Sequence, residues 1–493
     1  MNRACFTNAT KRKRSHERSE LNLSENNHMR AASGFFKTNY PPVVGQVLRM
    51  KLYFFATCLY FGLSTLNFQA RGQSVEKSQI ISSNDSLSLS LVLQRVMQSH
   101  PYVKEAEEAI NAADAKIGLA KSGYLPNVNF SASYVRIGPT ATFDIPQMGS
   151  FQLYPNDNYT ASLNYEQTLY DFGKTARGVN YAKEGKTLTT QNIDMVKQRL
   201  TSACVNTFYS LVLLQEAIHI KDVQLKTLND LLEFIEKQKA TGSATDYDLL
   251  VTKVRVSNSE SQKIDLLTSQ KILRSNLNSL MGAPGDANIN VKLDLSVTQP
   301  QVANDSLVSY ALNHRIEMTM AKERENAAGL QHLMVKAQNN PELNVFASGG
   351  WKNGYIPDLN VAKANYSVGL GLKVPILNGN RVKNNLLQTQ SFINNSTFET
   401  EMTRRNVSAE VIDNEANFAA SKKKITNYEL QLSQAEAAFE LANIKYKAGT
   451  IINFELLDVE ASVTQSRLFL LQSRIEYILN GYKLNIALGN KMY

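Results

Sequence analysis

The sequence is poor in cysteine, proline, glycine and tryptophan. Its 493 residues include three cysteines, 12 prolines, 24 glycines and a single tryptophan. Three cysteines exclude the disulfide framework of a small secreted domain, and the shortage of helix-breaking residues favours long, uninterrupted helices. Only Cys204 lies beyond the N-terminal segment, and its apolar helical surroundings predict a small buried core residue.

The sequence also lacks the motifs of common enzyme classes. It contains no phosphate-binding GxxxxGK[ST] loop, no GxSxG nucleophile motif and no complete GxGxxG. The four histidines beyond residue 72 show no metal-ligand spacing; they are His100, His219, His314 and His332. We therefore predict a protein that is not an enzyme and that has no catalytic residue, no bound metal and no cofactor.

Positive charge is in excess mainly at the N-terminus. The chain has 53 Lys and Arg against 44 Asp and Glu, a net charge of +9. Residues 1–49, which include the basic cluster Lys11–Arg14, account for six of these charges, and residues 50–71 account for two more. The rest of the chain is almost neutral, so we expect no nucleic-acid partner.

Residues 50–72 have the pattern of a secretory signal peptide. A lysine and an apolar run at 52–63 are followed by small residues, with Ala70 and Gly72 at positions −3 and −1 of the predicted cut. The run is shorter than the roughly 20 apolar residues that span a bilayer. Residues 1–49 have no place in such a signal, and we interpret them as an over-long gene start or a dispensable leader. A cytoplasmic tail with a signal anchor is the alternative.

An internal duplication is the most specific feature of the chain. The segment GSATDYDLL, from Gly242, matches GTIINFELL, from Gly449. The pairs Gly242/Gly449, His100/His314 and Pro126/Pro341 have offsets of 207, 214 and 215 residues. The first copy carries about eight extra residues before residue 169, a natural place for a variable loop. We predict that residues 73–290 and 291–493 are two structural repeats.

Each copy has the pattern helix, two strands, long helix, shorter helix. Strict alternation of apolar and polar residues predicts strands at 127–136, 159–169 and 366–376. A fourth strand, 343–351, is weaker because Phe346 breaks the alternation. Such strands occur in soluble hairpins with one wet face and in membrane barrels, and their length suits a tilted membrane span.

The predicted helices differ greatly in length. Helices at 87–122 and 306–339 precede the strands, long helices at 174–240 and 381–448 follow them, and shorter helices return at 247–281 and 454–488. Each long helix would measure about 100 Å. Apolar residues in the first one have coiled-coil spacing; they are Leu211, Leu214, Ile218, Leu225, Leu228, Leu232 and Ile235. We expect two short helices, placed end to end, to pack along each long one.

With these elements in order, residues 85–490 resemble the TolC-like outer-membrane efflux protein family. The resemblance rests on His100-Pro101, on YLP at 124–126, on the strand-to-helix joints LYDFG (169–173) and ILNG (376–379), and on the helix tip YKAG (446–449) with FELLD (454–458). It implies a mainly α fold with a small β part: long antiparallel coiled-coil helices and four strands per subunit. A homotrimer would close a 12-stranded β-barrel in the outer membrane and extend it as an α-helical tunnel in the periplasm of a Gram-negative cell.

The resemblance also implies a function and partners. The protein would be a passive exit duct of a tripartite efflux or secretion system, in contact with outer-membrane lipid, a periplasmic adaptor (membrane fusion) protein and an inner-membrane transporter. A type I protein-secretion duct, rather than a small-molecule efflux duct, is one alternative. A periplasmic coiled-coil scaffold is another, and it explains the helices but not the strands.

Members of this family have a periplasmic gate, and the resemblance places its residues at the helix tips. Glu455 and Asp458 fall on the acidic-ring positions, three residues apart on one helix face, where they would favour cations. Asp248 matches the acidic partner in the first copy and Tyr446 matches the network tyrosine. For Glu455 and Asp458 the alternative is a solvated helix start, where acids suit the helix dipole.

Two further features of the tips follow from the resemblance. Gly242 and Gly449 are expected in tight turns that would form the adaptor contact. The position of the family's gate arginine is occupied by Ile451. This gate therefore cannot use that ion pair.

Overall fold

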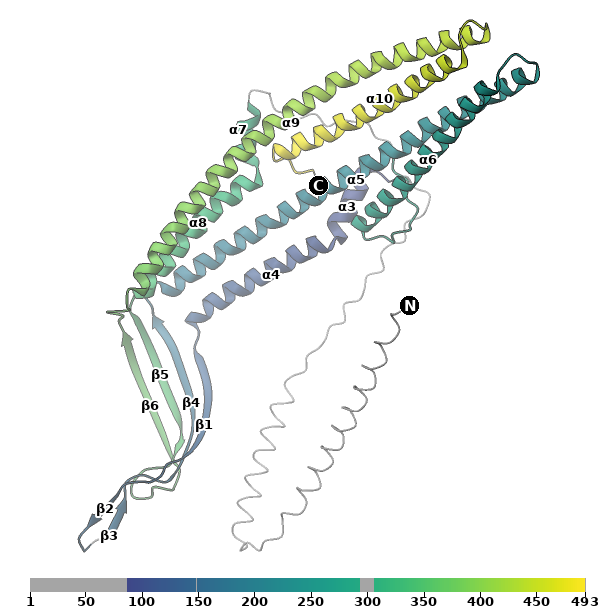
Figure 1. Ribbon diagram of the computed structural model, residues 1–493. Helices are drawn as coiled ribbons and strands as arrows, with labels where there is room; N and C mark the ends of the chain where they lie inside the picture. Colours follow the sequence, from purple (N-terminus) through teal and green to yellow (C-terminus); the bar gives the residue numbers. More distant parts are fainter. Residues whose placement is uncertain (1–86, 148, 293–305, 493) are drawn as a thin grey trace, which may run out of the picture. The chain divides into compact units, whose positions relative to one another are not determined.

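The computed structural model describes residues 87–147, 149–292 and 306–492 (Figure 1). The signal peptide predicted at 50–72 and the leader at 1–49 lie outside these residues. The described part is mainly helical with a small β part, which confirms the predicted fold class. No helix within it is both long and apolar enough to cross a membrane.

Four antiparallel strands form one sheet in the order β1-β4-β5-β6. They are β1 (Asn127–Arg136), β4 (Asp157–Tyr170), β5 (Glu342–Lys352) and β6 (Lys363–Lys373). All four strands were predicted, but the predicted end of the last one at residue 376 is wrong. β6 stops at Lys373 because its partner β5 begins opposite, at Glu342, and because Pro375 offers no backbone N–H.

The register of the strands divides the sheet into an apolar and a polar face. Phe130 lies opposite Leu163 and Val345 opposite Leu370, so apolar side chains line up across the sheet. This face is exposed in the single chain, with Tyr366 at 87% and Val368 at 72%. On the other face, Asn164 bonds to neighbours on both sides: its Nδ2 donates to Asn129 Oδ1 at 3.1 Å, and its Oδ1 accepts from Ser348 Oγ at 2.9 Å.

Phe346 explains why β5 was the weakest of the predicted strands. Its ring lies on the polar face, over two glycines of β6. A Cβ on Gly369 would come 2.5 Å from the ring, and one on Gly371 would come 3.7 Å from it. The aromatic ring covers backbone that these glycines leave bare, so the break in alternation is a cross-strand contact.

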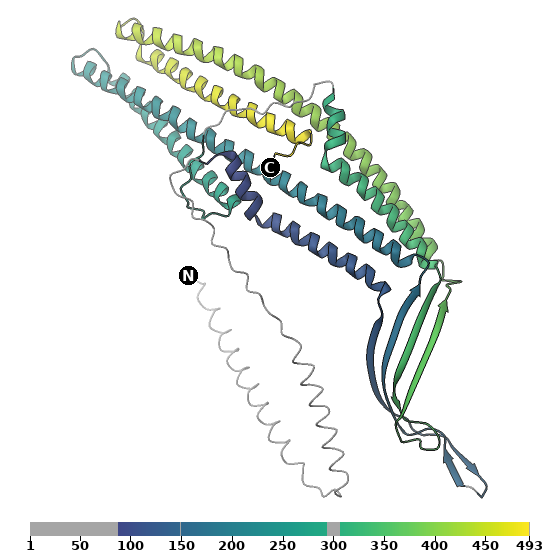
Figure 2. The ribbon, with the colours of Figure 1, turned by 180° about the vertical axis from the view of Figure 1, so that it is seen from behind.

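The extra residues of the first copy form a small hairpin between β1 and β4. Its strands are β2 (Thr142–Ile145) and β3 (Gly149–Gln152). At its base, Asn156 Oδ1 accepts hydrogen bonds from Thr140 Oγ1 and from Gln152 Nε2, both at 2.7 Å. The predicted variable loop therefore has its own sheet, which projects beyond the main one in Figures 1 and 2.

The first helix of each copy is broken, where one continuous helix was predicted. The pieces are α3 (Leu89–Ser99) and α4 (Pro101–Lys121) in the first copy, and α7 (Leu307–His314) and α8 (Ile316–Lys336) in the second. His100 is extended, with ψ 130°, as expected before a proline. Arg315 is extended in the same way, with ψ 129°. The structural counterpart of His100 is thus Arg315, and the predicted pairing with His314 is wrong by one residue.

Arg315 stabilises the break between α7 and α8, where no proline follows. Its side chain is 8% exposed and forms a two-pronged ion pair with Glu317, with N–O distances of 2.8 and 3.1 Å. Nη2 also lies 2.7 Å from Glu410 of α9 (Arg381–Lys447), and Nη1 donates to the Ala487 carbonyl at 3.2 Å. These contacts tie the joint to the helices that pack around it.

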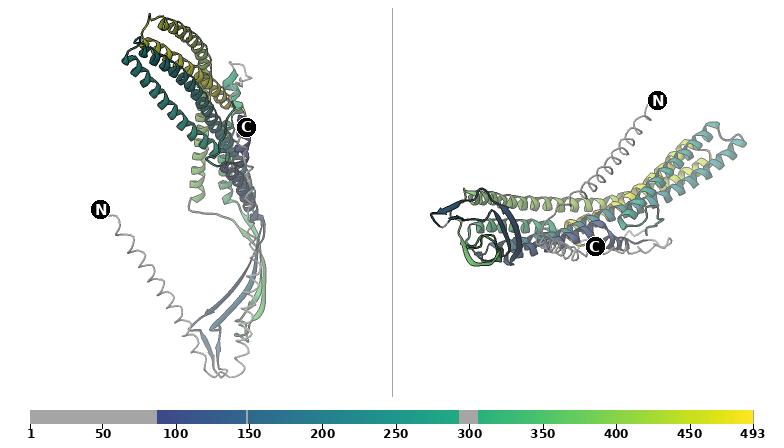
Figure 3. Two further views of the ribbon diagram at one scale, coloured as in Figure 1. Left: turned by 90° about the vertical axis from the view of Figure 1, so that its right-hand side faces the viewer. Right: turned by 90° about the horizontal axis from the view of Figure 1, so that it is seen from below.

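The long helices match their predictions closely. They are α5 (Lys174–Ala240) and α9 (Arg381–Lys447), and the return helices are α6 (Asp246–Met281) and α10 (Asn453–Ala487). α4 and α6 both pack along α5, and α8 and α10 both pack along α9. Figures 1 and 3 show these short helices following one another along each long one, which confirms the end-to-end arrangement. α5 also contacts α8 and α10, so it joins the two copies.

The main apolar core surrounds the middle of α5. Phe208 and Leu211 are fully buried there, against α3, α6 and α10. Cys204 is also fully buried in this core, which confirms its predicted role, and burial raises the pKa of its thiol to about 11. The described residues contain no cluster of three or more His, Cys, Asp or Glu side chains placed to hold a metal ion.

Candidate functional site

The predicted site lies where each long helix turns into its return helix. Both turns use a glycine with a left-handed backbone, Gly242 with φ 79° and Gly449 with φ 70°. In each, two amides close the helix end: Gly242 and Ser243 donate to Lys239 and Gln238, and Gly449 and Thr450 donate to Tyr446 and Lys445. The two copies therefore reverse direction by the same motif, and both glycines are exposed.

Asp248 has a local structural partner. It is the third residue of α6 and forms a capping box with Thr245. Thr245 donates to the carboxylate through its hydroxyl at 2.6 Å and its amide at 3.1 Å, and Asp248 N donates back to Thr245 Oγ1. This contact aligns the start of α6 and fixes the carboxylate close to its own helix.

Glu455 and Asp458 differ from Asp248 in this respect. Glu455 is also the third residue of its helix, but the residue before α10 is Ile452, which has no side-chain oxygen to cap it. Both carboxylates are exposed, and neither forms an ion pair with another described residue. They lie on the face of α10 opposite the buried Leu456 and Leu457, so they are available to solvent and ions.

Tyr446 lies against the first copy near the end of α9. Its ring meets Phe234 of α5 edge-on, with 6.1 Å between centroids. Burial raises the pKa of the Tyr446 hydroxyl, and the nearby charge of Asp248 raises it further. Tyr446 thus lies within electrostatic range of Asp248, whose carboxylate is bonded to Thr245.

A buried asparagine joins the two return helices. Asn453, the first residue of α10, is 3% exposed and donates through Nδ2 to Thr252 Oγ1 at 3.0 Å and to the Asp248 carbonyl at 3.3 Å. Its Oδ1 is buried and has no hydrogen-bond partner among the described residues. The two tips are therefore bonded to each other as well as packed together.

A second polar contact between the copies lies farther along α10, at residues that no sequence motif predicted. Lys221 of α5 donates to Gln224 Oε1 and to Gln262 Oε1 of α6, each at 2.7 Å. Gln224 Nε2 donates to Glu460 Oε2 of α10 at 3.1 Å. Lys221, Gln224 and Glu460 are only 7%, 6% and 5% exposed. We call these three residues and Gln262 the buried relay.

The charges of Lys221 and Glu460 partly compensate each other across this relay. Burial lowers the pKa of Lys221, and the negative charge of Glu460 opposes that shift. Thr464 donates a further hydrogen bond to Glu460 Oε1 at 2.9 Å. The apolar side chains of Leu225, Leu228 and Leu457 pack nearby and exclude water. The relay thus connects a buried cation of one copy to a buried anion of the other.

Comparisons with known proteins agree with this geometry. The sequence model of the family described as Outer membrane efflux protein matches residues 92–283 and 307–490. The chain is 22% identical over 419 residues to outer membrane protein TolC of Salmonella enteritidis, covering 82% of each protein. It is 22% identical over 408 residues to the alkaline protease secretion protein AprF of Pseudomonas aeruginosa, covering 80% of this chain and 82% of that one. The crystal structure of the outer membrane protein VceC from Vibrio cholerae matches with a TM-score of 0.70 at 20% identity, covering 82% of this chain and 97% of VceC.

Proposed function

The chain belongs to the outer membrane efflux protein family, and from this we infer that it is the outer-membrane exit duct of a tripartite efflux or secretion system. It acts in the outer membrane of a Gram-negative cell, with its helices in the periplasm. One observation supports this beyond the family match: a four-stranded sheet with an exposed apolar face extends from the ends of the long helices (Figure 1).

The sheet supports a trimer. Within the part of the chain that the structure describes, β1 and β6 each have a partner strand on one side only, and backbone groups at such edges cannot stay unpaired in lipid. We propose that β6 of one subunit pairs with β1 of the next and that threefold symmetry closes a 12-stranded barrel. The apolar face would meet lipid, and the asparagine and serine side chains would line the lumen. Residues 73–290 and 291–493 are proposed as the two repeats of each subunit.

The proposed partners are a periplasmic adaptor protein, an inner-membrane transporter and outer-membrane lipid. The turns at Gly242 and Gly449 are exposed and would form the adaptor contact. Similarity to AprF, which is named for alkaline protease secretion, supports protein secretion as a second candidate function. The duct serves whatever cargo the transporter delivers. A scaffold without a channel leaves the two-faced sheet unexplained.

Electron microscopy of the detergent-extracted protein tests the exit-duct proposal. From ~1.5 Å per helical residue and ~3.3 Å per strand residue, we expect a particle about 130–140 Å long. A hollow, threefold, tapered cylinder is the expected result. A compact particle or a solid filament would contradict the membrane duct and would favour the scaffold.

At the periplasmic end, we propose that Glu455 and Asp458 form the acidic ring of the gate. Threefold symmetry would bring six exposed carboxylates around the axis. Because Ile451 occupies the position of the family's gate arginine, no ion pair from that position can connect α10 to the first copy. Another contact must hold the two together. Asn453 and the buried relay provide it. Tyr446 and Asp248 then belong to the contact that surrounds the gate.

The ring proposal predicts ion selectivity. In the Glu455→Gln/Asp458→Asn variant, we expect the cation-to-anion permeability ratio to fall about tenfold, because six screened charges near the axis are removed. The measurement is the reversal potential of the purified protein in a planar bilayer under a KCl gradient. The matched control is Glu260→Gln/Asp265→Asn, which removes two exposed carboxylates of α6 farther from the tip. An equal effect in both variants would mean that charge anywhere on the helices sets the preference.

A further inference from the structure

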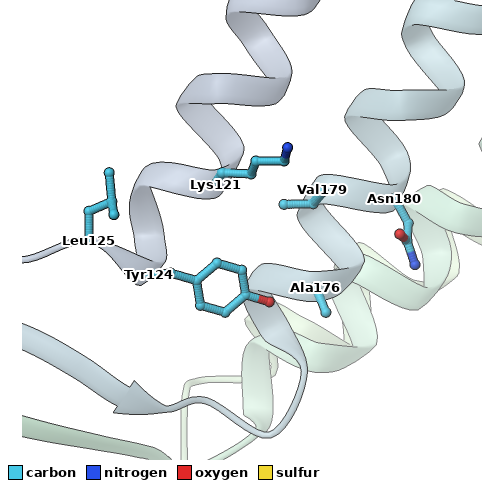
Figure 4. Close-up of a pocket in the computed structure, with 6 residues that line it drawn as sticks. All are labelled: Lys121, Tyr124, Leu125, Ala176, Val179 and Asn180. Carbon is cyan, nitrogen blue, oxygen red and sulfur yellow. The ribbon is translucent and has the colours of Figure 1, made fainter.

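A groove lies where α4 ends beside the start of α5, close to the sheet. It has a volume of about 450 Å³. Figure 4 shows Lys121, the last residue of α4, pointing toward Val179 of α5, and Tyr124, three residues later, pointing toward Ala176. Asn180 also lines the groove. Its lining is mostly apolar, with one cation and one amide at the rim. This composition suits an amphiphile better than a small polar solute.

Lys121 has no counter-charge in this groove. Two helical turns farther from the sheet, Lys186 of α5 lies 2.7 Å from Asp114 of α4. Seven residues along each helix, and therefore on the same faces, stand Lys121 and Val179. The helix that supplies a lysine to Asp114 thus offers only an apolar side chain to Lys121. No ion pair or hydrogen bond joins the Lys121 amine to another residue in the described part of the chain.

The groove adjoins the apolar face of the sheet. Tyr165 and Gln167 project from that face of β4, as the pairing of Tyr165 with Val128 shows. The Tyr165 hydroxyl donates to Gln167 Oε1, and Gln167 Nε2 donates to the Tyr124 carbonyl at 3.0 Å. These bonds connect the lipid-facing surface to the segment that lines the groove. Position and charge therefore agree: an apolar surface ends beside an uncompensated cation.

We propose that this groove binds a glycerophospholipid of the periplasmic leaflet. The Lys121 ammonium would hold the phosphate of the headgroup. Tyr124 and Val179 would contact the glycerol and the first carbons of the acyl chains. This inference rests on the proposed membrane position of the sheet. It adds a lipid site to each subunit and fixes the depth at which the barrel sits.

Native mass spectrometry of the delipidated, full-length trimer with added phosphatidylglycerol tests the site. In Lys121→Gln, we expect binding about fivefold weaker, the effect of losing one lysine near a lipid phosphate. In Ala176→Phe, an exposed position, the larger side chain should fill the groove and weaken binding without removing a charge. The matched control Lys104→Gln, exposed at the other end of α4, should bind lipid like the wild type.

Two results would overturn the proposal. One is lipid binding that is equal in the wild type, Lys121→Gln and Ala176→Phe. The other is dissociation of the Ala176→Phe trimer with lipid binding unchanged, which would show that a neighbouring subunit fills the groove. Inorganic phosphate, added at millimolar concentration, should not displace the lipid, because the acyl contacts are part of the site. Conductance of the same samples reports on the exit duct separately, so intact conductance with unaltered lipid binding would reject only the lipid site.

Discussion

In the Lys221→Met variant, the closed channel is expected to conduct more ions than the wild type. Methionine keeps the apolar stem but removes the ammonium, so Glu460 remains buried without its counter-charge. Loss of one partner from a buried charge pair destabilises by about 3 kcal/mol or more. Gln224 accepts from Lys221 and donates the hydrogen bond that connects α5 to Glu460 of α10, so the cost falls on the contact that holds the proposed acidic ring in place. Single-channel conductance in planar bilayers measures the effect.

A second variant and a matched control separate an effect on the proposed gate from an effect on general stability. In Lys221→Met/Glu460→Gln no charge stays buried, so conductance should lie closer to the wild type than in either single variant. Lys253→Met removes a half-exposed lysine that pairs with Glu236 at 3.3 Å, and a surface pair contributes ~1 kcal/mol or less. Thermal unfolding followed by circular dichroism measures stability alongside. Single variants that unfold more easily but conduct like the wild type would show that the relay stabilises the fold without controlling the gate.

The buried relay left a trace in the sequence. The apolar seam of α5 runs from Leu211 to Ile235 in steps of three and four, and between Ile218 and Leu225 the expected position is residue 221. A lysine stands there. A polar residue at a core position of a coiled coil often specifies register or partner, so the gap itself marked a site. Its partner Glu460 could not be found in this way, because only the packing of α10 on α5 brings the two copies together.

The helix and strand boundaries were predictable where local chemistry sets them. β1 begins directly after Pro126, and α5 follows a turn at Gly173, so each boundary has a local residue that causes it. The break at His100 also has a local cause, Pro101. The break at Arg315 has none, since Ile316 follows it. Its cause is the set of contacts with Glu410 and the Ala487 carbonyl, which no local pattern contains.

In the candidate site, too, some features follow from the local sequence and others from contacts between distant segments. The Thr245–Asp248 spacing is a capping signature that the sequence displays, and the structure uses it as one. Glu455 occupies the equivalent position of α10, but Ile452 cannot cap the helix, so the Glu455 carboxylate has no capping partner and stays exposed. The difference between the two acids depends on the residue three places earlier. The register of the two tips depends instead on Asn453, whose partners Thr252 and Asp248 come from the other copy.

Gly489→Ala is the variant for which we expect the largest loss of stability, because Gly489 packs against the break between α7 and α8. Gly489 follows α10 with φ 86°, and an added Cβ would lie 2.8 Å from the backbone carbon and oxygen of His314 and 3.0 Å from Arg315 N. Backbone atoms cannot swing aside as a side chain can. The end of α10 would have to shift, and that shift would pull the Ala487 carbonyl away from Arg315 Nη1.

Gly282→Ala is the matched control, because Gly282 ends α6 at the equivalent position of the first copy. Its φ is 69°, but the nearest atom to an added Cβ is Ser99 Oγ at 3.7 Å. Gly282→Ala should therefore lose only the ~1 kcal/mol of a left-handed alanine, whereas overpacking should cost Gly489→Ala about 3 kcal/mol more. Thermal unfolding of the two purified variants, compared by circular dichroism, gives the difference directly. Equal melting temperatures would mean that the joint at Arg315 yields without loss, and that the contacts around it do not hold the second repeat in shape.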